Sequence, residues 1–139
     1  MLVYCRKQKL EKSGFSLIEL MVAVAIVGIL ASIAYPSYVE YVTQSNRTEG
    51  QRELLRLASQ MEQYYLDHRA YTDDMKNLGS AKDPFESESG NYKIDASVSD
   101  DTFTLTATAQ GAMATKDAAC KSMTVTDAGV KSPSSGCWE

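Results

Sequence analysis

The sequence predicts an α+β fold, in which one long N-terminal helix packs across an antiparallel sheet. From Phe15 to about His68 the residues favour a single helix, interrupted only by Gly28, Pro36 and Gly50. After residue 90, apolar and polar residues alternate in successive short segments, as strands with one buried face do. At 139 residues the chain has room for one such domain and a helical extension.

Residues 15–35 form an apolar run of the length that a membrane span of about 20 residues requires. Glu19 lies inside this run, and a charged side chain at the bilayer centre costs on the order of 2.5–3.5 kcal/mol. A plain anchor has no use for such an acid. Gly28 lowers helix propensity and Pro36 removes a helical hydrogen bond, so we expect a kink or local unwinding there.

The second half of the helix is amphipathic. Its apolar residues recur at steps of three and four, which places them on one face, typical of core packing against a sheet. They are Leu54, Leu57, Ala58, Met61, Tyr64 and Tyr65. We therefore divide the chain into a short basic segment (1–14), a hydrophobic N-terminal helix (15–50) and a globular head domain (51–139).

The head domain is expected to contain four antiparallel strands. Residues 70–90 are rich in turn formers and are expected to be irregular. Strands are predicted at 92–98 and 103–109, joined by a short hairpin connection. A third is predicted at 123–125, and a fourth short strand near Val130.

Charge is unevenly distributed along the chain. The first 14 residues carry Arg6, Lys7, Lys9 and Lys12 against Glu11, and basic residues before an apolar span favour a cytoplasmic N-terminus with the C-terminal domain outside. The remainder has 10 basic and 17 acidic residues. This acidic balance argues against a general nucleic-acid coat, although a local patch can still bind.

The N-terminus resembles the class III signal of type IV prepilins. The resemblance rests on a short basic leader followed by Gly14-Phe15-Ser16-Leu17-Ile18-Glu19, with Gly28 and Pro36 in the same helix. It extends through Tyr35-Pro36-Ser37-Tyr38, residues 45–49 and Cys137-Trp138, which are similar to PilE-type minor pilins, relatives of the ComP DNA-uptake pilins.

This resemblance implies that a prepilin peptidase cuts after Gly14 and N-methylates Phe15. An ordinary secretory signal, cleaved near Ser32-Ile33-Ala34, is the alternative, and Glu19 within its apolar region counts against it.

The resemblance also suggests a role for Glu19 in assembly. The new amine of Phe15 lies four residues from Glu19. In a filament, the amine of an incoming subunit can pair with Glu19 of a neighbour, which penalises every other register. The alternative is that Glu19 serves only peptidase recognition.

Two cysteines remain once Cys5 leaves with the leader. Cys120 and Cys137 are an even pair in a chain destined for an oxidising compartment, which favours a disulfide that closes a C-terminal loop. Two unrelated thiols or a metal-binding pair are the alternatives.

The residues offer little to an enzyme or a cofactor. His68 is the single histidine, and a histidine near a helix end is more often a packing or capping group than a catalytic one. The sequence contains no phosphate-binding glycine loop. Acidic residues between 73 and 88 match no calcium motif. Lys116, Lys121 and Lys131, near the cysteine pair, are the candidates for contact with DNA, although scattered lysines are usually only surface residues.

The resulting hypothesis is a non-enzymatic minor pilin without cofactors. It is held in the inner membrane with its C-terminal domain in the periplasm, then assembled into an extracellular type IV pilus for adhesion, twitching motility or DNA uptake. Its expected partners are other pilin subunits, prepilin peptidase and the inner-membrane assembly machinery. Two alternatives are a ComP-like pilin that binds DNA through residues 112–137, and a type II secretion pseudopilin.

Overall fold

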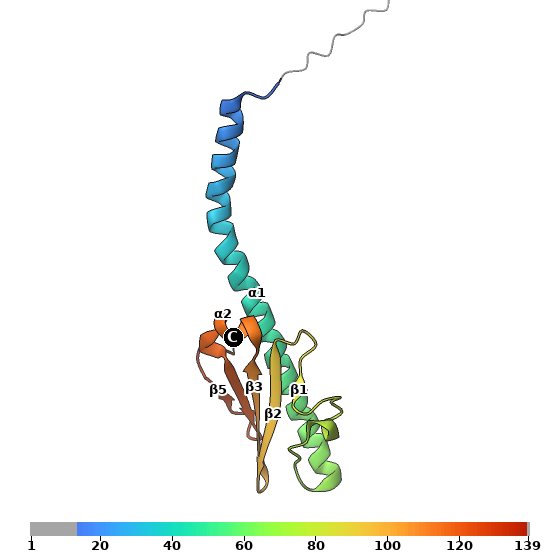
Figure 1. Cartoon of the computed structure of the whole chain (residues 1–139). Coiled ribbons are helices and arrows are strands. Elements are labelled where there is room, and N and C mark those ends of the chain that lie inside the picture. Colours follow the sequence, from blue (N-terminus) through green and yellow to red (C-terminus); the bar gives the residue numbers. More distant parts are fainter. Residues whose placement is uncertain (1–13, 139) are drawn as a thin grey trace, which may run out of the picture. The chain divides into compact units, whose positions relative to one another are not determined.

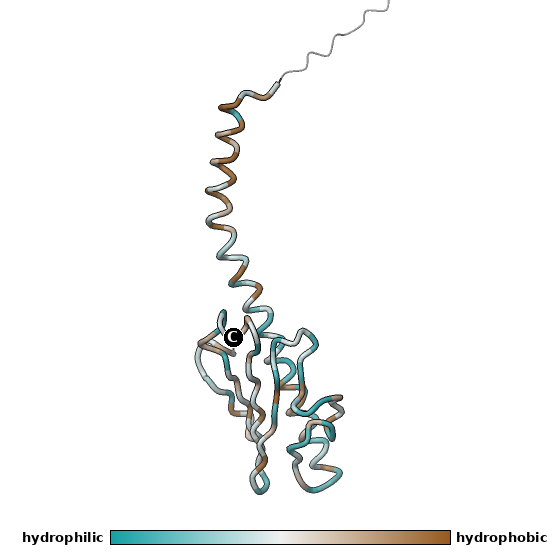
Figure 2. The backbone as a smooth tube through the Cα atoms, viewed as in Figure 1, coloured by the Kyte–Doolittle hydropathy of each residue, from teal (hydrophilic) through white to brown (hydrophobic). Residues whose placement is uncertain are grey.

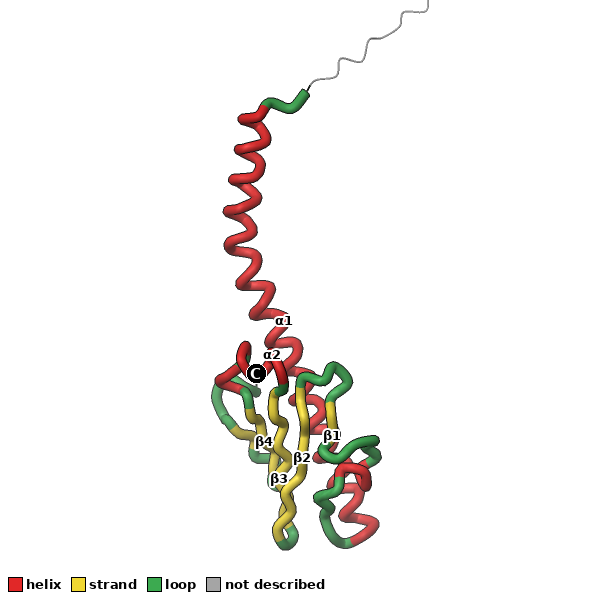
Figure 3. The backbone as a smooth tube through the Cα atoms, viewed as in Figure 1, coloured by secondary structure: helices red, strands yellow, loops and turns green. Residues whose placement is uncertain are grey.

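The computed structural model describes residues 14–138 (Figures 1 and 3). Its elements in chain order are α1 (Leu17–His68), η1 (Met75–Leu78), β1 (Phe85–Glu86), β2 (Tyr92–Ser99), β3 (Thr102–Ala109), α2 (Gly111–Lys116), η2 (Ala118–Cys120), β4 (Ser122–Thr126) and β5 (Lys131–Ser132). The chain separates into two compact units that divide between Tyr38 and Val39. Each unit is considered by itself.

The first unit consists of the N-terminal part of α1. The helix is continuous through Gly28 and Pro36, so it shows no local unwinding at either residue, and a kink there stays a prediction. The hydroxyl of Ser37 donates to the carbonyl oxygen of Ile33 at 3.3 Å, and Ser32 bonds Ile29 in the same way at 2.7 Å. These bonds to preceding carbonyl oxygens give each hydroxyl a hydrogen-bond partner within the helix itself, which a low-dielectric medium such as lipid requires.

The apolar side chains of this unit are exposed. Their exposed fractions run from 51% at Val22 to 84% at Phe15, and Figure 2 shows that this stretch is predominantly hydrophobic. An 18-residue window of α1 is apolar enough to cross a membrane, and none of it is buried. The core helix of a soluble domain would be mostly buried, so this segment requires lipid or another protein to cover it.

The second unit contains an antiparallel sheet in the order β1-β2-β3-β4-β5. The α+β prediction is confirmed, but the expected number of four strands is wrong. The additional strand is β1, which pairs Phe85 with Ile94 and Glu86 with Lys93 in a stretch that the turn formers marked as irregular. A strand of two residues has no periodicity to detect. The guanidinium of Arg56 lies 5.2 Å from the ring centroid of Phe85, which helps to hold this edge.

The predicted hairpin and the short last strand are present. β2 and β3 pair from Tyr92–Ala109 to Ser99–Thr102, and β5 pairs Lys131 with Val125. The helices α2 and η2, between β3 and β4, were not predicted, because six and three residues are too short to show helical periodicity.

The core lies between the amphipathic half of α1 and one face of the sheet. Leu54, Leu57 and Met61 are fully buried, as the helical stripe predicts, and they join Ile94 and Leu105 in one cluster. Each such side chain contributes about 1.5–3 kcal/mol by leaving water. Alternate residues of β2 and β3 face the cluster, in agreement with the polar–apolar alternation.

Gly50 of α1 packs directly against the ring of Tyr92 in the sheet. A Cβ placed on it would lie 3.0 Å from two ring carbons of Tyr92. The Tyr92 side chain is fully buried and its hydroxyl has no hydrogen-bond partner among residues 14–138. Burial raises the pKa of this phenol to about 12. The ring therefore has little freedom to move away from the helix.

This contact makes an unusual prediction for Gly50→Ala. Alanine in a helix interior normally stabilises by about 0.5–1 kcal/mol relative to glycine. Here the methyl group would strike the Tyr92 ring, and overpacking of this kind costs about 1–3 kcal/mol. We expect a net loss in the free energy of unfolding, measured by urea denaturation of a fragment that begins at Val39.

Ser59→Ala, at an exposed position of the same helix, is the matched control and should be neutral or stabilising. Combining Gly50→Ala with Tyr92→Leu should recover part of the loss. Equal stabilisation by both alanine variants would show that the ring contact imposes no constraint.

Candidate functional site

The predicted cleavage site lies just outside helix α1. Gly14 and Phe15 have no regular secondary structure and both are exposed. The first helical hydrogen bond of this end joins the Leu20 amide to the carbonyl of Ser16 at 3.2 Å. The Gly14–Phe15 peptide bond therefore lies in an exposed segment that is not part of the helix. Residues 1–13 of the predicted leader, with Cys5, lie outside the described residues.

Glu19 lies in the first turn of α1 and is exposed. A carboxylate there interacts favourably with the unpaired amide groups at the helix N-terminus. None of the ion pairs within residues 14–138 involves Glu19. Its position leaves the carboxylate accessible to a cation from outside this unit.

The second candidate region is the C-terminal loop. Cys120 and Cys137 form a disulfide and both residues are 2% exposed, so the predicted pairing is present. Within the described part of the chain, His, Cys, Asp and Glu side chains form no cluster of three or more that could hold a metal. The structure therefore has the disulfide in place of either alternative.

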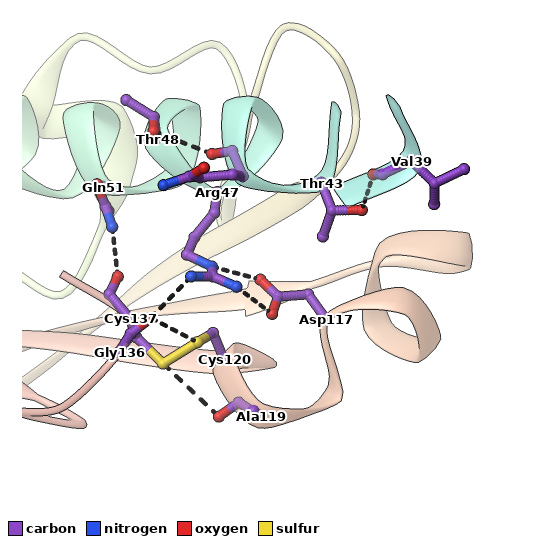
Figure 4. Close-up of polar contacts among 11 residues, drawn as sticks. Val39, Thr43, Arg47, Thr48, Gln51, Asp117, Ala119, Cys120, Gly136 and Cys137 are labelled. Atoms are coloured by element: carbon purple, nitrogen blue, oxygen red, sulfur yellow. Dashed lines mark hydrogen bonds and ion pairs between the residues drawn. A yellow bond between two sulfur atoms is a disulfide. The ribbon is translucent and has the colours of Figure 1, made fainter. Parts of the chain in front are cut away.

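Arg47 of α1 holds this loop through a forked contact, drawn in Figure 4. Its Nε and Nη2 donate to the two carboxylate oxygens of Asp117, both at 2.7 Å, and its Nη1 donates to the carbonyl of Gly136 at 2.8 Å. Asp117 is only 4% exposed, and a buried carboxylate without a partner is heavily penalised. The bidentate geometry is the strongest arrangement available to such a pair.

A neighbouring residue of α1 adds a second attachment to the loop. The side-chain amide of Gln51 donates to the carbonyl of Cys137. Sequence reasoning assigned no role to Asp117, and it included Arg47 only within residues 45–49 of the resemblance. Since the two residues are 70 positions apart, no local pattern could connect them.

Glu49 secures a different segment. Its carboxylate accepts hydrogen bonds from the Ser89 hydroxyl at 2.5 Å and the Ser89 amide at 3.2 Å. The segment that leads into β2 is thereby tied to α1. Residues 47–51 of one helix thus secure both the C-terminal loop and the entry to the central hairpin.

The three candidate DNA-contacting lysines are all exposed. Lys131 is the distinctive one, because its ammonium lies 5.1 Å from the ring centroid of Trp138. Lys116 and Lys121 flank the disulfide region. The neighbouring acid Asp117 is neutralised by Arg47, which leaves these lysines with less competing negative charge.

The single histidine has a packing role, as expected. The His68 ring stacks on Tyr64 with centroids 4.0 Å apart, and its Nδ1 lies 3.1 Å from the Tyr64 carbonyl oxygen.

Two family models match successive parts of the chain. The prokaryotic N-terminal methylation motif matches residues 11–35. A model described as "Type IV minor pilin ComP, DNA uptake sequence receptor" matches residues 36–124. The chain belongs to the type IV pilin family. This match confirms the resemblance found in the sequence and favours it over a type II secretion pseudopilin.

Individual relatives agree with this assignment. The pilin is 34% identical over 90 residues to the type IV major pilin PilA of Myxococcus xanthus, covering 63% of this chain and 39% of that protein. It is 33% identical over 100 residues to the major pilin PilE1 of Neisseria gonorrhoeae, covering 72% and 55%. The chain spans about half the length of the curated relatives it matches.

A solved structure has the same fold. A type IV pilin from Shewanella oneidensis superposes with a TM-score of 0.53 at 21% identity, over 70% of this chain and 98% of that one. Together with the long helix, the antiparallel sheet and the disulfide, this similarity confirms the pilin fold.

Proposed function

We propose that this pilin is made as a single-pass precursor in the inner membrane, with its C-terminal domain in the periplasm. Prepilin peptidase removes residues 1–14 and methylates Phe15, and the inner-membrane assembly machinery then adds the subunit to an extracellular type IV filament. The observation that carries the proposal is the apolar part of α1, exposed throughout and interrupted by one acid in its first turn. Its work is structural, with no reaction of its own.

The exposed helix supports two successive environments. In the membrane, lipid covers residues 15–35, and the helix satisfies its own backbone groups. In the filament, the same surface is covered by the helices of other subunits. The transfer requires that Glu19, costly in lipid, acquires a cation afterwards, and the Phe15 amine of a neighbouring subunit meets that need.

We assign the chain to the minor pilins, which are present in few copies. The family model that covers residues 36–124 carries a minor-pilin description, and this supports the assignment, although the individual relatives are major pilins. The filament would serve adhesion, twitching motility or DNA uptake.

Processing gives the first test. In cells that contain prepilin peptidase, we expect the mature chain to begin at methylated Phe15, as determined by mass spectrometry of subunits from sheared pili. Gly14 has open space around it, so replacing it with a larger residue leaves the fold intact while blocking entry to the peptidase. A mature chain that began at Tyr35 would establish a secretory signal instead.

Glu19→Val separates assembly from insertion. Valine makes the apolar segment more hydrophobic, so membrane levels should be kept or improved. The variant loses the acceptor for a neighbouring amine, so it should be depleted at least tenfold from sheared pili, since breaking a buried charge pair costs several kcal/mol. Glu40→Val, an exposed acid beyond the apolar run, is the matched control.

Both variants should be compared at equal leader cleavage and methylation, since loss of Glu19 can affect either step. Normal incorporation of a fully processed Glu19→Val subunit would contradict the role of Glu19 in assembly.

A second candidate function is DNA binding, favoured by the description of the matching family model as a DNA uptake sequence receptor. On this chain the candidate surface lies in residues 112–137, and the stacked Lys131 and Trp138 at its end combine a cation with an aromatic ring. Such pairs contact phosphates and bases in nucleic-acid sites. The net acidic charge of the chain requires any such contact to be local.

Lys131→Glu tests this candidate. We expect it to weaken binding of duplex DNA several-fold at low salt and to reduce the salt dependence by about one counterion, measured by fluorescence anisotropy. Lys82→Glu, at an exposed lysine distant in sequence, should change neither value. Equal losses in both variants would indicate only a general charge effect.

A further inference from the structure

The two arms of the disulfide loop meet on one guanidinium group. Arg47 binds Asp117, three residues before Cys120, and also the carbonyl of Gly136, the residue immediately before Cys137. Figure 4 shows the fork between the two arms, with the disulfide beside it. One side chain of α1 therefore contacts both segments whose cysteines must meet.

We propose that Arg47 is a positioning residue for disulfide formation: in the reduced chain it holds the two cysteine-bearing segments together, so that Cys120 and Cys137 react with each other. None of the hydrogen bonds from Arg47 to Asp117 and Gly136 uses a sulfur atom, so each can form before the thiols are oxidised. The role is independent of membrane insertion and filament assembly.

The first arm is rigidly connected to its cysteine. Asp117 ends α2, where its amide donates to the Met113 carbonyl at 3.0 Å. Its own carbonyl accepts the Cys120 amide at 3.1 Å and thereby closes η2. Fixing the Asp117 carboxylate therefore fixes the position of Cys120, since the intervening turn is hydrogen-bonded on both sides.

The second arm has less structure of its own and depends on α1. After β5 ends at Ser132, no regular element holds residues 133–138. Arg47 binds the carbonyl of Gly136, and Gln51 binds that of Cys137 one helical turn further on. The adjacent residues Leu54 and Leu57 anchor α1 in the core, so the helix is a fixed support for this otherwise irregular arm.

The chemistry is ordinary thiol–disulfide exchange with a small disulfide such as oxidised glutathione as the oxidant. One cysteine thiolate attacks the oxidant and releases one glutathione thiol, leaving a mixed disulfide. The second cysteine thiolate then attacks the protein sulfur, forms the Cys120–Cys137 bond and releases the second glutathione thiol. The protein dithiol loses two electrons and two protons, and oxidised glutathione takes up these electrons and protons to become two glutathione thiols.

Arg47 takes no part in the electron transfer. It raises the effective concentration of the second thiol at the mixed disulfide, as any device that pre-orders two reacting groups does. Without it, the arm that contains Cys137 has to be ordered at the moment of reaction, which lowers both the rate of the second step and the stability of the closed bond relative to the dithiol.

The test uses the full chain in detergent micelles with Cys5→Ser, so that Cys120 and Cys137 are the only thiols. The protein is equilibrated with reduced and oxidised glutathione, quenched with acid and alkylated. Mass spectrometry then gives the ratio of disulfide to dithiol protein, from which the effective concentration of the two thiols is calculated. Arg47→Gln should lower this concentration by about tenfold to a hundredfold, the range expected for losing charge-assisted hydrogen bonds.

Arg47→Lys should give an intermediate loss, because an ammonium can pair with Asp117 but lacks the planar fork that spans both arms. Arg52→Gln, an exposed arginine on the same helix, is the matched control and should lie within about twofold of the parent value. Leu57→Ala weakens the core but removes no hydrogen bond to the loop, so it should also leave the effective concentration of the folded protein unchanged.

Three results would overturn the proposal. The first is an unchanged effective concentration in a folded Arg47→Gln chain. The second is an equal fall in Leu57→Ala, because the measurement would then follow general stability. The third is failure of both Arg47 variants to fold even with the disulfide closed, which would make Arg47 a determinant of the whole fold.

Discussion

Helix α1 has to satisfy two solvation requirements in one continuous element. Its N-terminal part exposes every large apolar side chain, and its C-terminal part buries Leu54, Leu57 and Met61 against a sheet. Neither part can exchange roles with the other, because an all-apolar surface needs a non-aqueous partner and a one-sided stripe needs a globular core. The head domain therefore has to be complete without residues 15–35.

The way the head domain is closed follows from this requirement. Its sheet covers one side of the amphipathic helix, but the irregular chain after β5 has few apolar residues of its own to bury. The structure attaches it with directional contacts, through Arg47, Gln51 and the disulfide. Polar and covalent contacts thus hold the C-terminal segment in place, where there is little apolar surface to bury.

The sequence predicted those features that have periodicity or a local motif. The apolar run, the helical stripe, the hairpin and the cysteine pair each have a signature that can be read within about 20 residues. The strand β1 and the helix α2 are too short to repeat any pattern. Gly50 could be read only as a weak point of a helix, because its purpose depends on the Tyr92 ring. Arg47 and Asp117 were equally invisible as a pair, since only the fold brings them together.

Glu19 and Asp117 use the same electrostatic principle at different levels of organisation. A carboxylate in a dry environment is tolerated only when a cation is in one particular place, so a buried acid selects one arrangement and penalises the others. Asp117 finds its cation within the chain, and the fork of Arg47 fixes how the C-terminal loop lies on α1. Glu19 finds no cation within residues 14–138, because the ion pairs described there all join other residues. A carboxylate that pairs with a cation of its own chain helps to specify the fold. A carboxylate that has to pair with a cation of another subunit is suited to specify how subunits assemble. The head domain can therefore fold to completion in the monomer, while under the proposed function the pairing of Glu19 waits for the filament.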